Sequence, residues 1–159
     1  MIKLLLFDFA RVLLFPKDKS YLGKLNDLYK SIKDSSDFEF ESKFNFNEEL
    51  IKYLESIRNK FRLVMFTSEI IQNDPVVVKK LDGVFEDIIS AKEIGFSKSD
   101  PDAYRFIANK LGCKLNEILF IDDWEANVKC AESVGVNTHL FRDTNQLINY
   151  LNTLETLYT

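Results

Sequence analysis

The eleven residues from Leu4 to Leu14, LLLFDFARVLL, decide the fold of this 159-residue chain. The apolar run that begins at Ile2 is too short to span a membrane, and it is typical of a strand buried on both faces of a parallel sheet. Asp8 follows this run directly, at the point where such a strand leaves the sheet. We therefore expect Asp8 to have a functional role.

The composition indicates one globular domain over residues 1–159. Hydrophobic residues make up 46% of the chain and charged residues 29%, as in ordinary soluble domains. A net charge of −4 with scattered lysines argues against nucleic acid as a partner. Neither export nor membrane anchoring is expected, because Asp8 and Arg11 interrupt the first apolar run. Cys113 and Cys130 lack metal-site spacing, which favours reduced thiols in a cytoplasmic protein.

Beyond the first strand, the hydrophobic spacing predicts an alternation of helices and strands. An amphipathic helix is expected from Lys17 to Ser35, and the alternating stretch 37–46 is either an edge strand or an ordered loop. Further strands are predicted at 61–68, 84–90, 118–122 and 138–141, and helices at 47–57, 75–81, 101–111 and 124–134. This alternation is typical of an α/β protein with a parallel sheet and helices on both faces.

Polar residues end several of these strands, which indicates a ligand site. Asp8 ends the first strand, Thr67 the second, and Asp122 with Asp123 the fourth. In such sheets ligands bind beyond the carboxyl ends of the strands. Carboxylates held together repel one another, and Mg²⁺ is a cation that accepts both carboxylate and phosphate oxygens. Asp8 is then also a candidate nucleophile for forming an aspartyl-phosphate, with Lys98 neutralising the charge.

The order of these residues along the chain resembles that of the haloacid dehalogenase superfamily. Four segments, spread along nearly the whole chain, carry the resemblance: LLLFDFARVLL (4–14), VMFTSE (64–69), GFSKSDPDAY (95–104) and FIDDWEANVKCAESVGV (120–136). Receiver domains of bacterial signalling use the same residue types, but their acidic pair comes early and their lysine last, opposite to the order here.

The resemblance assigns a role to each of the matching residues. It implies that Asp8 is nucleophile and metal ligand, that Lys98 orients it, and that Thr67 binds phosphate, a role in which Ser68 could replace it. The metal would be Mg²⁺, bound by Asp8, Asp123, the backbone carbonyl of Ala10 and, in support, Asp122 and Asn127. Trp124 is interpreted as a packing residue that could also touch substrate, and His139 as structural.

Three positions depart from the superfamily pattern, and one of them, Ser99 in place of the usual proline after the motif lysine, is expected to be harmless. Ala10 stands where its phosphatases usually carry a second aspartate, the general acid and base, and Arg11 stands where glycine is common. Loss of a general acid costs about 10²- to 10⁴-fold in rate, so slow turnover remains expected, best on aryl or acyl phosphates. Alternatively, Arg11 occupies the phosphate site and pairs with Asp123 or Asp8, leaving a pseudoenzyme that binds a phosphorylated ligand or a protein.

Two other superfamily branches also lack the second aspartate. Phosphonoacetaldehyde hydrolases use a Schiff-base lysine from a cap domain, and the candidates here are Lys17, Lys19, Lys24, Lys30, Lys33 and Lys43. Dehalogenases of 2-haloacids bind no metal, which the pair Asp122 and Asp123 argues against.

We therefore expect a three-layer, doubly wound α/β fold with strand order 3-2-1-4-5, which places Asp8 beside Asp123. Residues 16–46 would form a small insertion or reduced cap. The expected function is Mg²⁺-dependent hydrolysis of a small phosphorylated molecule, impaired by the loss of the acid at Ala10.

Overall fold

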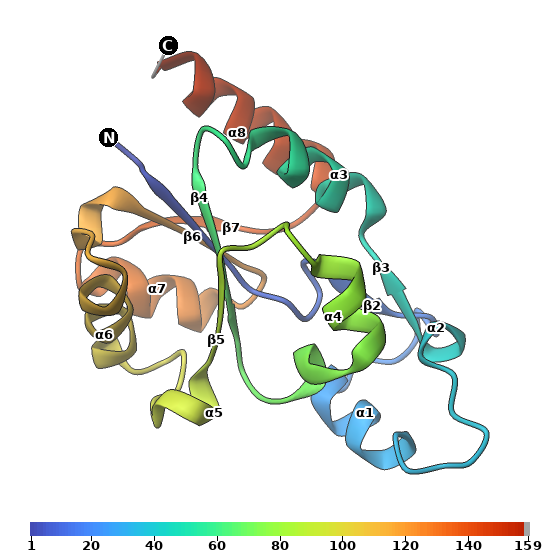
Figure 1. Cartoon of the computed structure of the whole chain (residues 1–159). Coiled ribbons are helices and arrows are strands. Elements are labelled where there is room, and N and C mark those ends of the chain that lie inside the picture. Colours follow the sequence, from blue (N-terminus) through green and yellow to red (C-terminus); the bar gives the residue numbers. More distant parts are fainter. Residues whose placement is uncertain (158–159) are drawn as a thin grey trace.

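A five-stranded parallel sheet forms the centre of the molecule. The computed structural model describes residues 1–157 (Figure 1). The sheet has the order β5-β4-β1-β6-β7, which is the predicted order 3-2-1-4-5 when its strands are numbered along the chain. Its strands are β1 (Leu4–Phe7), β4 (Arg62–Thr67), β5 (Asp87–Ser90), β6 (Ile118–Asp122) and β7 (Asn137–Leu140). The predicted α/β class and strand order are confirmed.

Helices cover both faces of the sheet, and β1 divides its side chains between them. Leu5 and Phe7 belong to one hydrophobic cluster, whereas Leu4 and Leu6 belong to the other. The first cluster includes residues of α3 (Glu48–Ile57), α4 (Pro75–Leu81) and α8 (Thr144–Leu157), and the second those of α6 (Pro101–Leu111) and α7 (Glu125–Ser133). Because alternate strand residues point to opposite faces, this central strand is apolar throughout.

The helix starts follow the predicted capping chemistry. Asn47 accepts a hydrogen bond from the backbone of Leu50 at 3.2 Å, which caps α3. Asp74 and Asp100 cap α4 and α6 in the same way, and each is followed by a proline in the first turn. Gly112 ends α6 with a φ of +64°. These helices begin and end where the sequence predicts.

The first predicted helix is much shorter than expected. Only α1 (Leu25–Ile32) is helical within the range 17–35. Before it, the Asp18 carboxylate accepts hydrogen bonds from the backbone and hydroxyl of Ser20, which forms a local turn. The apolar spacing that includes Leu22 therefore did not indicate a helix there, and Leu22 itself is exposed.

Other segments also differ from the predictions. The undecided stretch 37–46 contains both a short helix, α2 (Phe40–Lys43), and a strand, β3 (Phe44–Phe46). The strand pairs antiparallel with β2 (Leu14–Pro16), which the sequence analysis missed. The helices α5 (Ala91–Ile94) and α8 were not predicted either, although Leu147, Leu151 and Leu154 recur at helical spacing.

Residues 16–46 pack onto the main body through aromatic side chains. The Phe40 ring lies 4.8 Å from that of Phe44 and 5.7 Å from that of Phe46, and Tyr29 contacts it edge-on. Phe40 and Phe44 are part of the same hydrophobic cluster as the first strand.

Across residues 1–157, none of the helices has both the length and the apolar character required to cross a bilayer.

Candidate active site

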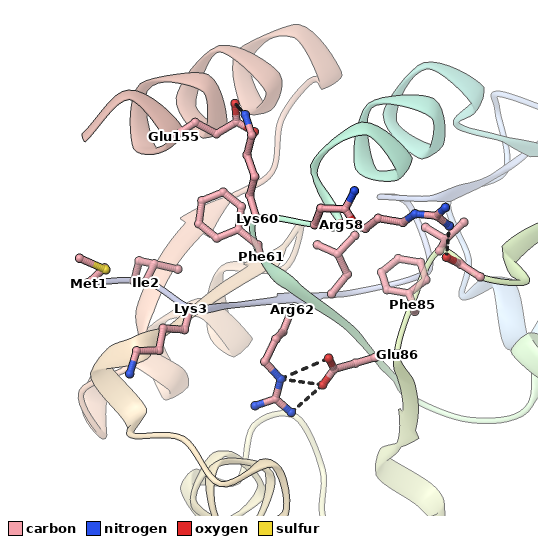
Figure 2. Close-up of a pocket in the computed structure, with 14 residues that line it drawn as sticks. Met1, Ile2, Lys3, Arg58, Lys60, Phe61, Arg62, Phe85, Glu86 and Glu155 are labelled. Carbon is pink, nitrogen blue, oxygen red and sulfur yellow. Dashed lines mark hydrogen bonds and ion pairs between the residues drawn. The ribbon is translucent and has the colours of Figure 1, made fainter. Parts of the chain in front are cut away.

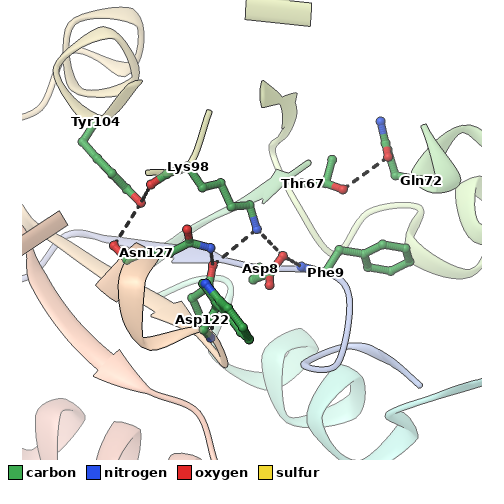
Figure 3. A network of polar contacts seen from close by, with 9 residues as sticks. Asp8, Phe9, Thr67, Gln72, Lys98, Tyr104, Asp122 and Asn127 are labelled. Atoms are coloured by element: carbon green, nitrogen blue, oxygen red, sulfur yellow. Dashed lines mark hydrogen bonds and ion pairs between the residues drawn. The ribbon is translucent and has the colours of Figure 1, made fainter. Parts of the chain in front are cut away.

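The carboxyl ends of the three central strands place the predicted polar residues at one edge of the sheet. β1 pairs with β4 on one side and β6 on the other, so Asp8 lies between Thr67 and Asp122 (Figure 3). Lys98 enters from the loop between α5 and α6. Residues from four distant segments are thereby brought together.

Asp8 and Lys98 form a buried ion pair. One oxygen of Asp8 accepts hydrogen bonds from the Lys98 ammonium and from the backbone of Phe9, the latter at 2.6 Å. Lys98 also lies 3.4 Å from a carboxylate oxygen of Asp122. Asp8 is only 6% exposed and Lys98 5%. A charge so deeply buried is tolerated only when it is paired, which these contacts provide.

The three acidic residues can share a metal ion. Asp8, Asp122 and Asp123 each offer an oxygen, and these atoms all lie within 4.8 Å of one another. Asp122 already accepts hydrogen bonds from the backbone of Trp124 at 2.7 Å and the side-chain amide of Asn127 at 3.0 Å. Asp123 is more exposed. Hard carboxylate oxygens at this spacing fit Mg²⁺.

The pKa shifts of Asp8 and Lys98 also indicate that the acidic cluster needs a cation. Burial raises the pKa of the Asp8 carboxyl well above its usual range, Lys98 opposes this shift, and Asp122 reinforces it. Burial disfavours the charge on Lys98, but Asp8 and Asp122 outweigh it and raise the pKa of that ammonium. Lys98 thus stays charged, and one lysine does not balance three carboxylates. A divalent cation would favour ionised Asp8.

Tyr104 holds the Lys98 backbone in place, a role that the sequence analysis did not foresee. Its hydroxyl lies 2.6 Å from the Lys98 carbonyl and 3.3 Å from that of Asn127, so it bridges the Lys98 loop to α7 (Figure 3). The Lys98 ammonium lies 5.6 Å from the centre of the Phe66 ring. Its position in the sequence could have indicated this role. Tyr104 follows Lys98 by six residues and lies on the buried face of α6.

Thr67 is buried at the end of β4, and its hydroxyl donates to Oε1 of Gln72 at 3.3 Å. Ser68, the alternative phosphate-binding residue, is exposed. Glu69, next along the chain, forms an ion pair with Lys30. Gln72 was not predicted, since nothing in its local sequence distinguishes it from a surface residue.

The loop after Asp8 makes a tight turn. The carbonyl of Phe9 accepts hydrogen bonds from the backbones of Leu13 at 2.9 Å and Leu14 at 3.1 Å. Arg11 occupies this turn with a φ of +61°, a conformation that favours glycine. Ala10, beside it, is half-buried and has no group that could transfer a proton.

The Arg11 side chain does not pair with the carboxylates, contrary to the alternative raised above. One of its guanidinium nitrogens donates to the carbonyls of Tyr21 and Gly23, each at 2.8 Å. In the part of the chain that the structure describes, it makes no ion pair with Asp8 or Asp123. Arg11 therefore joins the Asp8 loop to the insertion instead of replacing a metal ion.

Helix α1 of the insertion is also fastened to the loop that follows β4. Asn26 accepts hydrogen bonds from the backbones of Ile70 at 3.3 Å and Ile71 at 3.2 Å. The Tyr29 hydroxyl donates to Asp74 at 3.0 Å. Together with the Lys30–Glu69 pair, these contacts hold the insertion against the loop that follows β4.

The Schiff-base lysine expected of the phosphonate branch has no suitable candidate. The six lysines considered for it are all exposed, namely Lys17, Lys19, Lys24, Lys30, Lys33 and Lys43. Such a lysine needs a desolvated ammonium to react as a free amine. The insertion therefore does not favour that chemistry.

A pocket lies at the opposite, amino end of the sheet (Figure 2). Its lining includes Lys3, Lys60 and Arg62, but each of these cations pairs with a carboxylate. The Arg62–Glu86 contact is bidentate, at 2.6 to 3.2 Å. This pocket is separate from the Asp8 cluster and offers it no residue.

Fold and site together place an aspartate, a lysine and an acidic cluster at the switch point of a parallel sheet. The model of the haloacid dehalogenase-like hydrolases matches residues 3–135. The chain belongs to the haloacid dehalogenase-like hydrolase family.

Individual relatives share parts of the sequence or the whole fold. Bifunctional epoxide hydrolase 2 of Rattus norvegicus is 38% identical over 60 residues, which are 38% of this chain and 11% of that protein. The match thus spans only about a tenth of that relative's length. A predicted HAD-like family hydrolase of Porphyromonas gingivalis has a TM-score of 0.67 and 18% identity, covering 97% of this chain and 98% of its own.

A HAD-family enzyme of Bacteroides thetaiotaomicron, in complex with magnesium and inorganic phosphate, is similar in fold. Its TM-score is 0.66 at 15% identity, covering 92% of this chain and 99% of that one. At this identity the likeness concerns the fold.

Proposed function

We propose that the protein is a cytoplasmic, Mg²⁺-dependent phosphatase acting on a small phosphorylated molecule, with residues 16–46 as a reduced cap. The observation that carries this proposal is the buried Asp8–Lys98 pair beside Asp122 and Asp123. A Mg²⁺ and phosphate complex of a protein with the same fold gives further support. The net negative charge and the acidic site disfavour nucleic acid as substrate.

Asp8 is the proposed nucleophile. Its carboxylate oxygen forms a bond to phosphorus while the bond from phosphorus to the leaving oxygen breaks, and that oxygen departs with the electron pair. Lys98 keeps Asp8 oriented and offsets negative charge, and the Thr67 hydroxyl can donate to a phosphate oxygen. Water then attacks phosphorus, which releases phosphate and restores Asp8.

Mg²⁺ bound by Asp8, Asp123 and the Ala10 carbonyl, supported by Asp122, would supply positive charge for the phosphoryl oxygens. Asp122 also keeps the loop in place through its contacts with Trp124 and Asn127.

Ala10 determines which substrates are suitable. Without an acid at this position, the leaving group must depart unprotonated. Aryl and acyl phosphates meet that requirement, whereas alkyl phosphates need a proton. We therefore expect measurable turnover on activated phosphates only.

The test is hydrolysis of an aryl phosphate with and without Mg²⁺ by the wild type, Asp8→Asn and Ala10→Asp. We expect Mg²⁺-dependent turnover by the wild type that Asp8→Asn abolishes. Ala10→Asp should extend turnover to alkyl phosphates. If the wild type shows no turnover and Ala10→Asp restores none, the phosphatase proposal fails.

Ala10 also favours a second candidate, a protein that binds a phosphorylated ligand or a protein partner without turning anything over. The second aspartate is missing while the other site residues are in place. Equilibrium binding of inorganic phosphate with Mg²⁺ in the absence of any turnover would support this candidate. Turnover of the aryl phosphate by the wild type would contradict this candidate.

A further inference from the structure

Trp124 is an exposed aromatic residue placed beside the acidic cluster. It is the only tryptophan of the chain, and 63% of it is exposed. We interpreted it as a packing residue from the sequence, and this exposure shows that it does not pack in the core. Its backbone is nevertheless fixed, because its N–H donates to Asp122 at 2.7 Å.

A second exposed apolar residue, Leu22, belongs to the loop that Arg11 holds. The two carbonyls that accept from Arg11 belong to Tyr21 and Gly23, on either side of Leu22, which is 88% exposed. Arg11 therefore joins the loop after Asp8 to the loop that carries Leu22.

The placement of these two residues differs from that of the other exposed apolar side chains. Among residues 1–157, the remaining large ones lie on helices or at a chain end, namely Met1, Val76, Val78, Phe106 and Leu157. Leu22 and Trp124 are instead on loops: Trp124 directly follows Asp122 and Asp123, and Arg11 binds the carbonyls on either side of Leu22. Ligand-binding sites combine apolar and aromatic side chains with a small number of polar groups.

We propose that Trp124 is a specificity-determining residue that stacks against an aromatic ring of the substrate, with Leu22 adding apolar contact. The substrate class is then phosphorylated aromatic compounds, either aryl phosphates or aroyl phosphates. This inference rests on the proposed phosphate site at Asp8. It agrees with Ala10, since aryl and aroyl leaving groups depart without a proton.

Binding of two phosphonates tests the inference without any requirement for turnover. Phenylphosphonate and methylphosphonate carry the same anionic group and differ in the ring. With Mg²⁺ present, we expect phenylphosphonate to bind about three- to tenfold more tightly, the range that an aromatic contact contributes. The fluorescence of the single tryptophan should change with phenylphosphonate more than with methylphosphonate.

Variants at Trp124 separate stacking from a general effect. By titration calorimetry, Trp124→Ala should reduce the preference for phenylphosphonate to about one, and Trp124→Phe should retain most of it. Val78→Ala, on the exposed side of α4, is the matched control and should keep the wild-type preference. Equal affinities in the wild type, a preference that survives Trp124→Ala, or no binding of either phosphonate would overturn the inference.

The phosphatase proposal and the aromatic subsite at Trp124 are tested separately. Mg²⁺-dependent turnover of acetyl phosphate with no preference for phenylphosphonate would leave the phosphatase intact and remove the role of Trp124. A preference for phenylphosphonate without turnover of acetyl phosphate or benzoyl phosphate would keep the aromatic subsite and favour the binding protein.

Discussion

Arg11 stands where glycine is common in the superfamily, and its side chain has a structural role. Its φ of +61° belongs to the left-handed region, which costs a non-glycine residue about 1 to 2 kcal/mol. The two hydrogen bonds from its guanidinium to Tyr21 and Gly23 offset that cost, since a hydrogen bond from a charged group contributes about 1.5 to 3 kcal/mol. The substitution thus has a structural reason at a position where glycine would fit without strain.

Two variants at this position separate backbone strain from side-chain contacts. Arg11→Ala keeps the strained conformation and removes both hydrogen bonds, so we expect a loss of about 1 to 3 kcal/mol in the free energy of unfolding. Arg11→Gly should lose about 1 kcal/mol less, because glycine adopts a positive φ freely. Urea denaturation measures both values. Equal losses for the two variants would contradict the left-handed conformation.

His139 is predicted to make stability depend on pH. Its ring stacks on Tyr150 at 4.7 Å, and its Nε2 is buried without a hydrogen-bond partner among the described residues. Burial lowers the pKa of this imidazole, and Asp143 partly opposes the shift. Because the folded-state pKa lies below the unfolded value of 6.5, His139 costs no stability at higher pH and destabilises the fold as the pH falls through 6.5.

The matched variant for this prediction is His139→Phe, which keeps a ring against Tyr150. The difference in free energy of unfolding between wild type and variant should be constant above pH 7 and turn against the wild type between pH 6.5 and 5. Urea denaturation across that range provides the measurement. A difference that stays constant down to pH 5 would show that His139 titrates normally.

At the scale of elements, α1 contributes to the site through what it holds. Asn26 is buried and satisfies two backbone N–H groups of the loop after Thr67, while Tyr29 and Lys30 bind Asp74 and Glu69. These contacts join an insertion after β1 to the loop after β4. Side-chain hydrogen bonds therefore add to the aromatic packing that holds the insertion in place.

Asn26→Ala should release the loop 69–74. It leaves the N–H groups of Ile70 and Ile71 without an acceptor, which costs about 1 to 3 kcal/mol. We expect faster hydrogen exchange at these two amides, measured under native conditions. Asn26→Asp keeps the acceptor oxygen and should preserve their protection. Unchanged exchange in Asn26→Ala would mean that Asn26 does not hold this loop in solution.

For the whole molecule, the acidic cluster should couple metal binding to stability. Three carboxylates near one lysine repel one another, so an ion that binds them in the native state stabilises the fold. At a hundred times its Kd, Mg²⁺ should contribute about 2.7 kcal/mol, or about 5 to 10 °C in Tm.

Thermal unfolding with and without Mg²⁺ measures this contribution. Asp123→Asn should remove most of the Mg²⁺-dependent rise in Tm, because it takes away the most exposed carboxylate of the cluster. Glu132→Gln, on an exposed face of α7, is the control and should keep the rise. A rise of equal size in Asp123→Asn would place the ion elsewhere.

The sequence by itself determined the central sheet and the residues at its carboxyl edge. Apolar runs such as 4–7 and 118–121 are periodic signals contained within a few residues, and capping residues such as Asp74 and Asp100 act on their own helices. The strand order and the identity of Asp8, Lys98 and Asp123 as candidates followed from such local signals and from the resemblance.

Only the tertiary structure decided what the side chains contact. Arg11 binding to the insertion, Tyr104 bridging Lys98 and Asn127, and the exposure of Trp124 each depend on segments 10 or more residues apart or on solvent access. A long side chain at the edge of a site has several partners within reach, and the packing of other segments selects among them. The sequence therefore predicted Arg11 as a site residue but not the contact that it makes with the insertion.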